Sequence, residues 1–173
     1  MATNDSGDAG KGQGDTRQCN LLQLYIKDVS FESPGVPGVL FGHEQPALQF
    51  DVSSTYKLSA EASAKLGEVY AVLVRVTVQA AAGDKTLFLI EVEQGGLFEL
   101  HGYAEDEKDF ALRTRAPELL YPYVRELVAS LVSRSGFPRL QLRPINFEGR
   151  YSQSMKEYYE AAAKMAEAAA SQA

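Results

Sequence analysis

The fold of this chain is decided by residues 69–100, whose sequence is VYAVLVRVTVQAAAGDKTLFLIEVEQGGLFEL. In the first half, every second residue from Tyr70 to Val78 is apolar, and most of the residues between them on the second face are polar or small. This period of two is typical of a strand that buries one face. Residues 82–85 include a glycine and an aspartate and predict a turn. The stretch is therefore predicted to form the central antiparallel pair of a sheet.

The second strand of this pair has two unlike faces. One face is apolar throughout, with Phe88, Ile90 and Val92. The other mixes apolar and acidic residues: Leu87, Leu89, Glu91 and Glu93. A face of this kind is either covered by another part of the chain or forms a subunit interface or a binding groove. The paired glycines 95 and 96 predict a bulge or a close approach to another segment.

Two further strands are predicted upstream, over residues 21–32 and 48–53. The apolar pattern of the first switches sides near Lys27, which indicates a bulge or two halves that pack on different elements. Residues 34–46 show no period and are predicted to form a long crossover loop. Residues 59–65 are interpreted as a polar connector.

Two helices complete the predicted fold. The apolar stripe of residues 120–132 predicts a principal helix that ends at Gly136, with Pro122 in its first turn or at a kink. The charged residues 105–109 form a loop or the start of a helix. A last helix is expected from about Glu148, with fraying in its alanine-rich end. This order predicts an α+β domain, a four-stranded antiparallel sheet with two C-terminal helices on one side.

The composition fits one soluble globular domain. The chain has 173 residues, 45% of them hydrophobic and 23% charged, and a net charge of −6, which argues against nucleic acid as a partner and favours basic partners. No apolar run is long enough to span a bilayer. Residues 1–20 contain no hydrophobic region, so we expect a disordered leader and a cytoplasmic protein.

Residues suited to catalysis or metal binding are few. The only cysteine is Cys19, and His43 and His101 are the only histidines, so neither a disulfide nor a metal site is expected. The sequence contains no nucleophile elbow, zinc-protease motif or phosphate loop. Carboxylates on the predicted strands are most simply solvated surface charges. We expect no enzyme activity and no cofactor.

A family resemblance runs in order along the chain from about Leu21 to Tyr151. It is carried by YIKDVSFESP at 25–34, QP at 45–46, VY at 69–70, LVRVTV at 73–78, EV at 91–92 with QGG at 94–96, Pro117 with Leu120, PY at 122–123 with RE at 125–126, VSR at 132–134, FP at 137–138, and Pro144 with NF at 146–147. Together these segments closely resemble the SecB export chaperones.

The resemblance implies a cytoplasmic, ATP-independent holdase that keeps newly made secretory precursors unfolded and passes them to the SecA ATPase. It also implies a homotetramer, a dimer of dimers whose long helices lie between two extended sheets. The chaperone domain would span residues 21–155, after a leader at 1–20 and before an alanine-rich tail at 156–173. Direct insertion into a membrane is not implied.

The resemblance also assigns sites. The positions that match the family's SecA-contact surface are Asp28, Glu32, Leu89 and Glu91. An acidic patch that contains a leucine suits a basic partner segment. The positions that match the family's client grooves are Leu48, Phe50, Val52, Phe88 and Tyr151, with Phe31 and Phe147 as additions. Apolar contact is non-directional, so such grooves accept many sequences.

The sequence departs from the family in two places. Glu44 stands where members commonly have a tryptophan, so Phe41 is a candidate for that part of the groove wall. The alanine-rich C-terminal tail also differs, which puts the family's tail contact with SecA in question.

Two other functions remain open at this point. One is a chaperone dedicated to a single partner, such as an antitoxin, and the other is a small-ligand enzyme on the same fold. Asp28, Glu32 and Glu91 favour export, because a dedicated chaperone has no need of a SecA surface.

Overall fold

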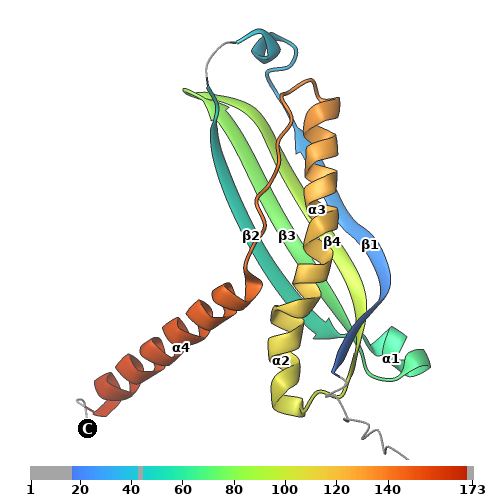
Figure 1. Cartoon of the computed structure of the whole chain (residues 1–173). Helices are drawn as coiled ribbons and strands as arrows, with labels where there is room; N and C mark the ends of the chain where they lie inside the picture. Colours follow the sequence, from blue (N-terminus) through green and yellow to red (C-terminus); the bar gives the residue numbers. More distant parts are fainter. Residues whose placement is uncertain (1–16, 43–44, 171–173) are drawn as a thin grey trace, which may run out of the picture.

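The computed structural model describes residues 17–42 and 45–170. Four antiparallel strands form one sheet in the order β1-β4-β3-β2 (Figure 1). Their bounds are β1 Gln18–Glu32, β2 Ala47–Leu58, β3 Val69–Ala82 and β4 Lys85–His101. The predicted central pair, β3 and β4, occupies the centre of the sheet. Between β1 and β2 the chain crosses from one sheet edge to the other, as expected for the aperiodic loop.

The α+β class and the four-stranded sheet are confirmed, but the helices are more numerous than expected. They are η1 Gly38–Phe41, α1 Ala60–Leu66, α2 Glu105–Arg113, α3 Arg115–Arg134 and α4 Phe147–Ala170. The interpretation of residues 59–65 as a connector is wrong, because the Ser59 hydroxyl accepts the Ala62 N–H and caps the helix α1. The charged stretch is the start of α2, where three carboxylates occupy the first turn.

The break between α2 and α3 has a local cause. Pro117 has no N–H to donate to the carbonyl of Arg113, four residues earlier. Thr114 at the break is fully buried, and its hydroxyl is satisfied by donating to the carbonyl of Phe110 at 2.7 Å. Pro122 lies well inside α3, beyond the first turn, with its ring exposed.

The core lies between α3 and the face of the sheet that α3 covers, here called the inner face. On β3 and β4 this face is a layer of side chains that are at most 1% exposed, including Val74, Val76, Ile90 and Val92. Residues of α3 at helical spacing pack on it and are fully buried: Leu120, Val124, Val128 and Val132. The apolar face of the two central strands therefore packs against the apolar stripe of the helix, and both patterns were recognised in the sequence.

The paired glycines of β4 allow close packing on both faces of the sheet. An added Cβ at Gly96 would lie 2.7 Å from Leu21 Cδ1 and 2.9 Å from Leu120 Cδ2, so the helix rests almost on the backbone here. An added Cβ at Gly95 would lie 2.3 Å from the ring of Tyr25. β4 pairs without interruption through both positions, so the close-approach interpretation is confirmed.

Bulges decide which face several side chains reach. Lys27 has no partner in the pairing of β1 with β4, so Ile26 and Val29 stand opposite Gln94 and Val92 on the same inner face. The predicted bulge is thereby confirmed, and a second one occurs at Leu22.

A third bulge lies in β4, where the register with β3 shifts at Leu87. Leu87 consequently packs against the core. The prediction that Leu87 lies beside Leu89 on the opposite face is wrong, because strict alternation of side chains does not hold across a bulge.

One carboxylate links the start of α4 to two elements of the body. Asp109 of α2 accepts hydrogen bonds from Tyr56 of β2 at 2.6 Å, Arg113 at 2.7 Å and Tyr151 of α4 at 3.1 Å. Partial burial alone would raise the pKa of the Asp109 carboxyl, but these hydrogen bonds and the Arg113 charge outweigh it and lower the pKa. Beyond this attachment α4 projects away from the sheet (Figure 1).

The ends of the described chain differ from the expected domain limits. β1 begins at Gln18, inside the expected leader of residues 1–20, and the helix α4 continues to Ala170 through most of the expected tail. Residues 1–16 and 171–173 lie outside the described residues. Among the described helices, none is long and apolar enough to cross a membrane.

A methyl group at Gly96 tests the contact between α3 and the sheet. Gly96→Ala is expected to lower the free energy of unfolding by roughly 2 kcal/mol, because the added carbon overlaps Leu21, Phe98 and Leu120. Urea denaturation measures the loss. Gly38→Ala is the control, since nothing lies within 4 Å of its added Cβ. Equal stability of the two variants would contradict this packing.

Removal of the Asp109 carboxylate tests the attachment of α4. In Asp109→Ala, hydrogen exchange of the backbone amides of residues 151–158 is expected to rise about tenfold, because a helix without tertiary support is only marginally stable. Mass spectrometry of deuterium uptake measures it. Asp106→Asn, on the same helix and exposed, is the control. Exchange in Asp109→Ala that equals the control would contradict the role of Asp109.

Candidate functional site

A cavity of about 500 Å³ opens at the end of the inner face where the β3–β4 turn, η1 and the segment after α3 meet. Leu48 of β2 and Phe88 of β4 belong to its lining. Larger apolar side chains from η1, from β4 and from the segment that follows α3 complete much of the lining: Val39, Leu40, Leu87, Phe137, Pro138 and Leu140. The cavity is mainly apolar and open to solvent. The cavity and the adjoining exposed part of the inner face on β2 are together called the groove.

The groove exists because α3 leaves β2 uncovered. The helix contacts β4, β3 and β1, and the chain then returns along the inner face as the connector, residues 137–146 (Figure 1). Tyr121 and Arg125 of α3 hold the connector by donating to the carbonyls of Arg143 at 2.8 Å and Leu142 at 2.8 Å. One wall of the groove is therefore fixed to the principal helix.

Three aromatic rings stiffen the closed end of the groove. Phe88 stacks on Phe31 of β1 with ring centroids 6.0 Å apart, and it meets Phe137 of the connector at 5.0 Å. Phe88 is 4% exposed, so it forms the floor and offers little surface of its own. Ser33 donates to the carbonyl of Leu87 at 2.6 Å and joins the end of β1 to the bulge.

The face of β2 provides the exposed part of the groove. Leu48 is 50% exposed and Phe50 is 44% exposed, whereas Val52 is buried at 3%. The Val52 carbonyl accepts a hydrogen bond from Arg150 of α4 at 2.9 Å. β2 pairs with β3 alone, so its other edge carries unpaired backbone groups.

The remaining predicted client residues lie beyond Val52. Phe147 is 6% exposed and meets the ring of Tyr121 edge-on, with centroids 5.9 Å apart. Tyr151 meets Phe110 at 5.3 Å and donates to Asp109. Leu48 and Phe88 thus line the cavity, with Phe31 stacked behind Phe88, and Phe50 continues the groove along β2. The other three predicted residues lie near the start of α4: Val52, Phe147 and Tyr151.

The client residues assigned from the resemblance do not include much of the groove wall. Val39, Leu40 and Leu140 line the cavity, and the signal for them was the apolar residues in two segments without any period. Phe41, the proposed substitute wall, is 77% exposed and does not line the cavity. Val39 and Leu40 form this wall instead, because Leu40 packs against Gly136 at the end of α3. Glu44 lies outside the described residues.

The opposite face of the sheet, here called the outer face, is acidic. Strand pairing sets Glu32 beside Leu89, Ser30 beside Glu91, and Asp28 beside Glu93. All four residues predicted for the SecA surface therefore lie together on β1 and β4. Asp51 of β2 stands opposite Thr77, which is opposite Glu91, and the sequence interpretation did not include it.

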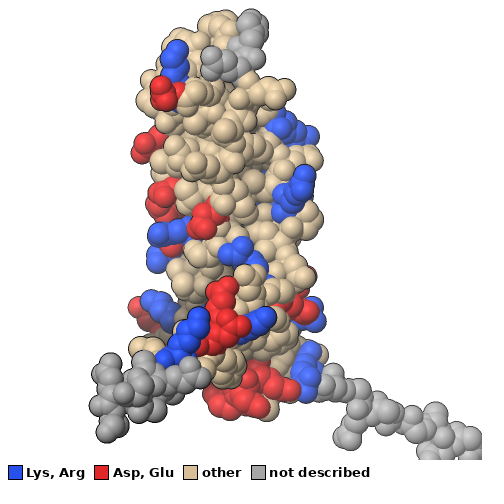
Figure 2. Space-filling view, turned by 90° about the vertical axis from the view of Figure 1, so that its left-hand side faces the viewer, with Lys and Arg blue, Asp and Glu red and all other residues tan. Residues whose placement is uncertain are grey.

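Few cations balance this face. Arg75 contacts Glu93 at 3.0 Å and Lys27 approaches the same carboxylate at 3.8 Å. Among the described residues, Asp28, Glu32, Asp51 and Glu91 make no ion pair. Figure 2 views the β2 side. In its upper half, acidic groups follow the border on the outer face below a basic group at the very top, basic groups follow the opposite border, and uncharged surface lies between the two borders. The outer face can attract a basic partner.

The groove and the outer face have the chemistry of binding surfaces. No carboxylate, cysteine or histidine lines the groove among the described residues. In the described part of the chain, no group of three His, Cys, Asp or Glu could hold a metal ion. An apolar hollow with exposed aliphatic and aromatic side chains can take up apolar side chains of another polypeptide.

Comparison with known proteins agrees with this fold and site. The family described as "Preprotein translocase subunit SecB" matches residues 12–158. The "Protein-export protein SecB" of Chromohalobacter salexigens is 39% identical over 163 residues, which cover 91% of this chain and 96% of that protein. The protein of the same name from Hydrogenovibrio crunogenus is 41% identical over 144 residues, which cover 83% of this chain and 93% of that protein.

A solved structure has the same fold at lower sequence identity. It is titled as the Mycobacterium tuberculosis Rv1957 SecB-like chaperone in complex with a ChAD peptide from the Rv1956 HigA1 antitoxin, and it has a TM-score of 0.53 at 18% identity. The match covers 73% of this chain and 90% of that one. At this identity the likeness concerns the fold alone. The family match and the two relatives, which cover most of both chains, show that this chain belongs to the SecB family of protein-export proteins.

Proposed function

We propose that this protein is an ATP-independent holdase of the cytoplasm, which binds unfolded secretory precursors in the groove and delivers them to the SecA ATPase. The observation that carries the proposal is the open apolar groove along β2. A cavity of about 500 Å³ accommodates a few side chains of an extended segment and excludes a folded domain. Only an unfolded chain presents such segments.

The contacts within the groove explain how one site can serve many clients. Leu48 and Phe50 offer exposed apolar surface, and burial of such surface depends on area and little on sequence. Three other assigned residues are buried and act as packing support for the groove: Val52, Phe88 and Phe147. Phe31 packs behind Phe88, and Tyr151 sets the base of α4.

The SecA-binding surface comprises Asp28, Glu32, Leu89 and Glu91 on the outer face. The support for it is the cluster of unpaired carboxylates around a partly buried leucine. Long-range attraction would speed the encounter with a basic segment, and Leu89 would add a small apolar contact. Asp51 extends the surface onto β2. This face lies opposite the groove, so client and SecA can be held at the same time.

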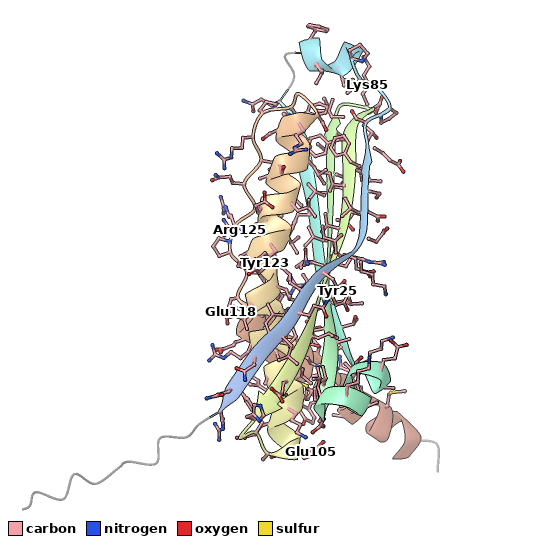
Figure 3. All side chains as sticks on the ribbon, turned by 90° about the vertical axis from the view of Figure 1, so that its right-hand side faces the viewer. Tyr25, Lys85, Glu105, Glu118, Tyr123 and Arg125 are labelled. Atoms are coloured by element: carbon pink, nitrogen blue, oxygen red, sulfur yellow. The ribbon has the colours of Figure 1, made fainter. Side chains whose placement is uncertain are left out.

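A homotetramer, arranged as a dimer of dimers, is supported by apolar surface that this chain leaves uncovered. On β1, an edge strand, the inner-face residues Leu24, Ile26 and Val29 are between 36% and 57% exposed. Beside them on α3, Leu119 is 44% and Tyr123 is 46% exposed. Figure 3 looks onto this surface, with β1 in front and α3 beside it. Such a surface suits an isologous interface.

The dedicated-partner alternative receives no separate support. The antitoxin peptide belongs to the 18% identical neighbour, whereas the relatives at 39% and 41% identity are export proteins by name. Export is therefore the preferred function.

A charge placed in the groove tests client binding. Phe50→Asp is expected to weaken binding of a fluorescently labelled, unfolded secretory precursor by about tenfold to a hundredfold, because the aspartate removes apolar surface and resists desolvation. Fluorescence anisotropy measures the affinity, and light scattering checks that the variant keeps four subunits.

Gln49→Asp is the matched control, since Gln49 directly precedes Phe50 on β2 and faces the other side. Unchanged client affinity in a tetrameric Phe50→Asp would remove the groove assignment. A wild-type protein that gains no mass from unfolded precursor would remove the holdase function altogether.

A charge reversal on the outer face tests SecA binding. Glu91→Lys is expected to weaken SecA binding about tenfold at low salt, with a smaller effect at high salt, where exposed charges are screened. Surface plasmon resonance measures the affinity. Glu61→Lys on α1 makes the same charge change at the start of β3, eight residues along that strand from Thr77, the partner of Glu91. If both variants bind SecA equally well, the assignment of the outer face is wrong.

A further inference from the structure

The distal half of α4 exposes large apolar side chains. Each residue from Lys156 to Met165 is exposed, and beyond its start the helix projects away from the sheet (Figure 1). Tyr158 is 67%, Tyr159 is 65% and Met165 is 75% exposed. The match to the family ends at residue 158, so it does not account for the end of this helix. An isolated helix is only marginally stable, and this half of α4 therefore calls for a partner.

The apolar residues of this half form one seam along the helix. Four of them follow one another at alternating intervals of three and four residues: Met155, Tyr158, Ala162 and Met165. This is the spacing of the core positions of a coiled coil. By the same helical geometry, the charged residues lie on the opposite side: Lys156, Glu157, Glu160 and Lys164. Tyr159 and Ala161 flank the seam, so no charge stands at its edges near the centre.

The seam is complementary to itself when two copies lie antiparallel. It is symmetric about Glu160, with Tyr158 and Ala162 two residues to either side. In an antiparallel pair centred there, the Tyr158 ring packs on Ala162 of the partner subunit, and the two methionines of the seam lie opposite each other. A parallel pair would instead set ring against ring and leave a gap between two alanines.

The area of the seam also fits a second copy. A tyrosine buries roughly 150–250 Å², so the rings of Tyr158 and Tyr159, which are about two thirds exposed, offer on the order of 250 Å² per copy. With the methionines and alanines of both copies, a pair would bury about 1,000 Å², the lower limit for a specific interface. Such a pair suits subunits that one assembly already holds at high effective concentration.

We propose that α4 is an interaction surface for a second copy of this chain, and that the distal halves of two α4 helices form an antiparallel coiled coil. Arg150 and Tyr151 fix the start of α4 to β2 and α2. Paired helices would therefore connect the groove regions of two subunits. The inference does not use client binding, so it can fail while the holdase function stands.

A cross-link across the seam tests the pairing. Ala161→Cys and Ala163→Cys are made in the full chain, each together with Cys19→Ala to remove the native thiol, and treated with a short bismaleimide. Ala161 flanks the seam near its centre of symmetry, so its thiols are expected to join two chains into a covalent dimer on a denaturing gel. Ala163 lies on the charged side of the helix and is the control, which should remain a single chain.

A charge placed in the seam provides the second test. Ala162→Arg is expected to raise the hydrogen exchange of the backbone amides of residues 158–165 about tenfold, because the unpaired helix is only marginally stable. Mass spectrometry of deuterium uptake measures it. Ala163→Arg makes the same substitution one residue further along, with the same change in helix propensity, and should keep the wild-type rate.

Two results would overturn the inference. One is a cross-linking yield that is the same at positions 161 and 163, whether high or absent. The other is equal amide exchange in Ala162→Arg and Ala163→Arg. Client affinity, measured on the same samples by fluorescence anisotropy, separates the two functions: intact client binding together with either result refutes the pairing of α4 alone.

Discussion

The width of one helix limits how much of the sheet can be buried, and the rest of the structure depends on that limit. An α-helix with its side chains is about 10 Å across and strands lie about 4.8 Å apart, so a single helix covers little more than two strands. α3 lies over β4 and its two neighbours, where Gly96 lets the helix approach the sheet. β2 is only partly covered, by the connector and, towards its C-terminal half, by α2 and the start of α4. The groove is the space that remains.

The two faces of the sheet are kept chemically distinct by interruptions in strand alternation. The bulge at Lys27 keeps apolar residues of β1 on the inner face while Asp28 joins the carboxylates outside. The bulge at Leu87 moves a leucine and a lysine to the inner face. The same molecule can therefore hold an apolar groove on one side and an acidic surface on the other.

The predictable parts of this fold follow from regular periods. The alternation in residues 69–100 and the apolar stripe of residues 120–132 predict the sheet centre and the principal helix, because burial enforces those periods. The bulge in β1 was visible in the sequence, because the apolar pattern changes from one face to the other near Lys27. The helix α1 gave no such signal, since a helix of seven residues is specified by one cap and local propensity.

The candidate site was predictable only in part. Leu48 and Phe50 follow from the family resemblance and lie in the groove. Val39, Leu40 and Leu140 come from segments without a period, and nothing local in their sequence says which surface they meet. Leu87 lines the cavity because of a bulge that alternation does not reveal. Its placement required the pairing of β3 with β4 to be known.

The strand order also has a consequence for how this chain is made. β1 pairs only with β4, and β2 pairs only with β3, so the first two strands to leave the ribosome have no native partner. At a synthesis rate of roughly 5–20 residues per second, β2 waits on the order of seconds before the β3–β4 hairpin is complete. The hairpin, with its local contacts, is the natural nucleus to which both edge strands are added. Each newly made subunit thus passes through a state with two exposed, unpaired strands.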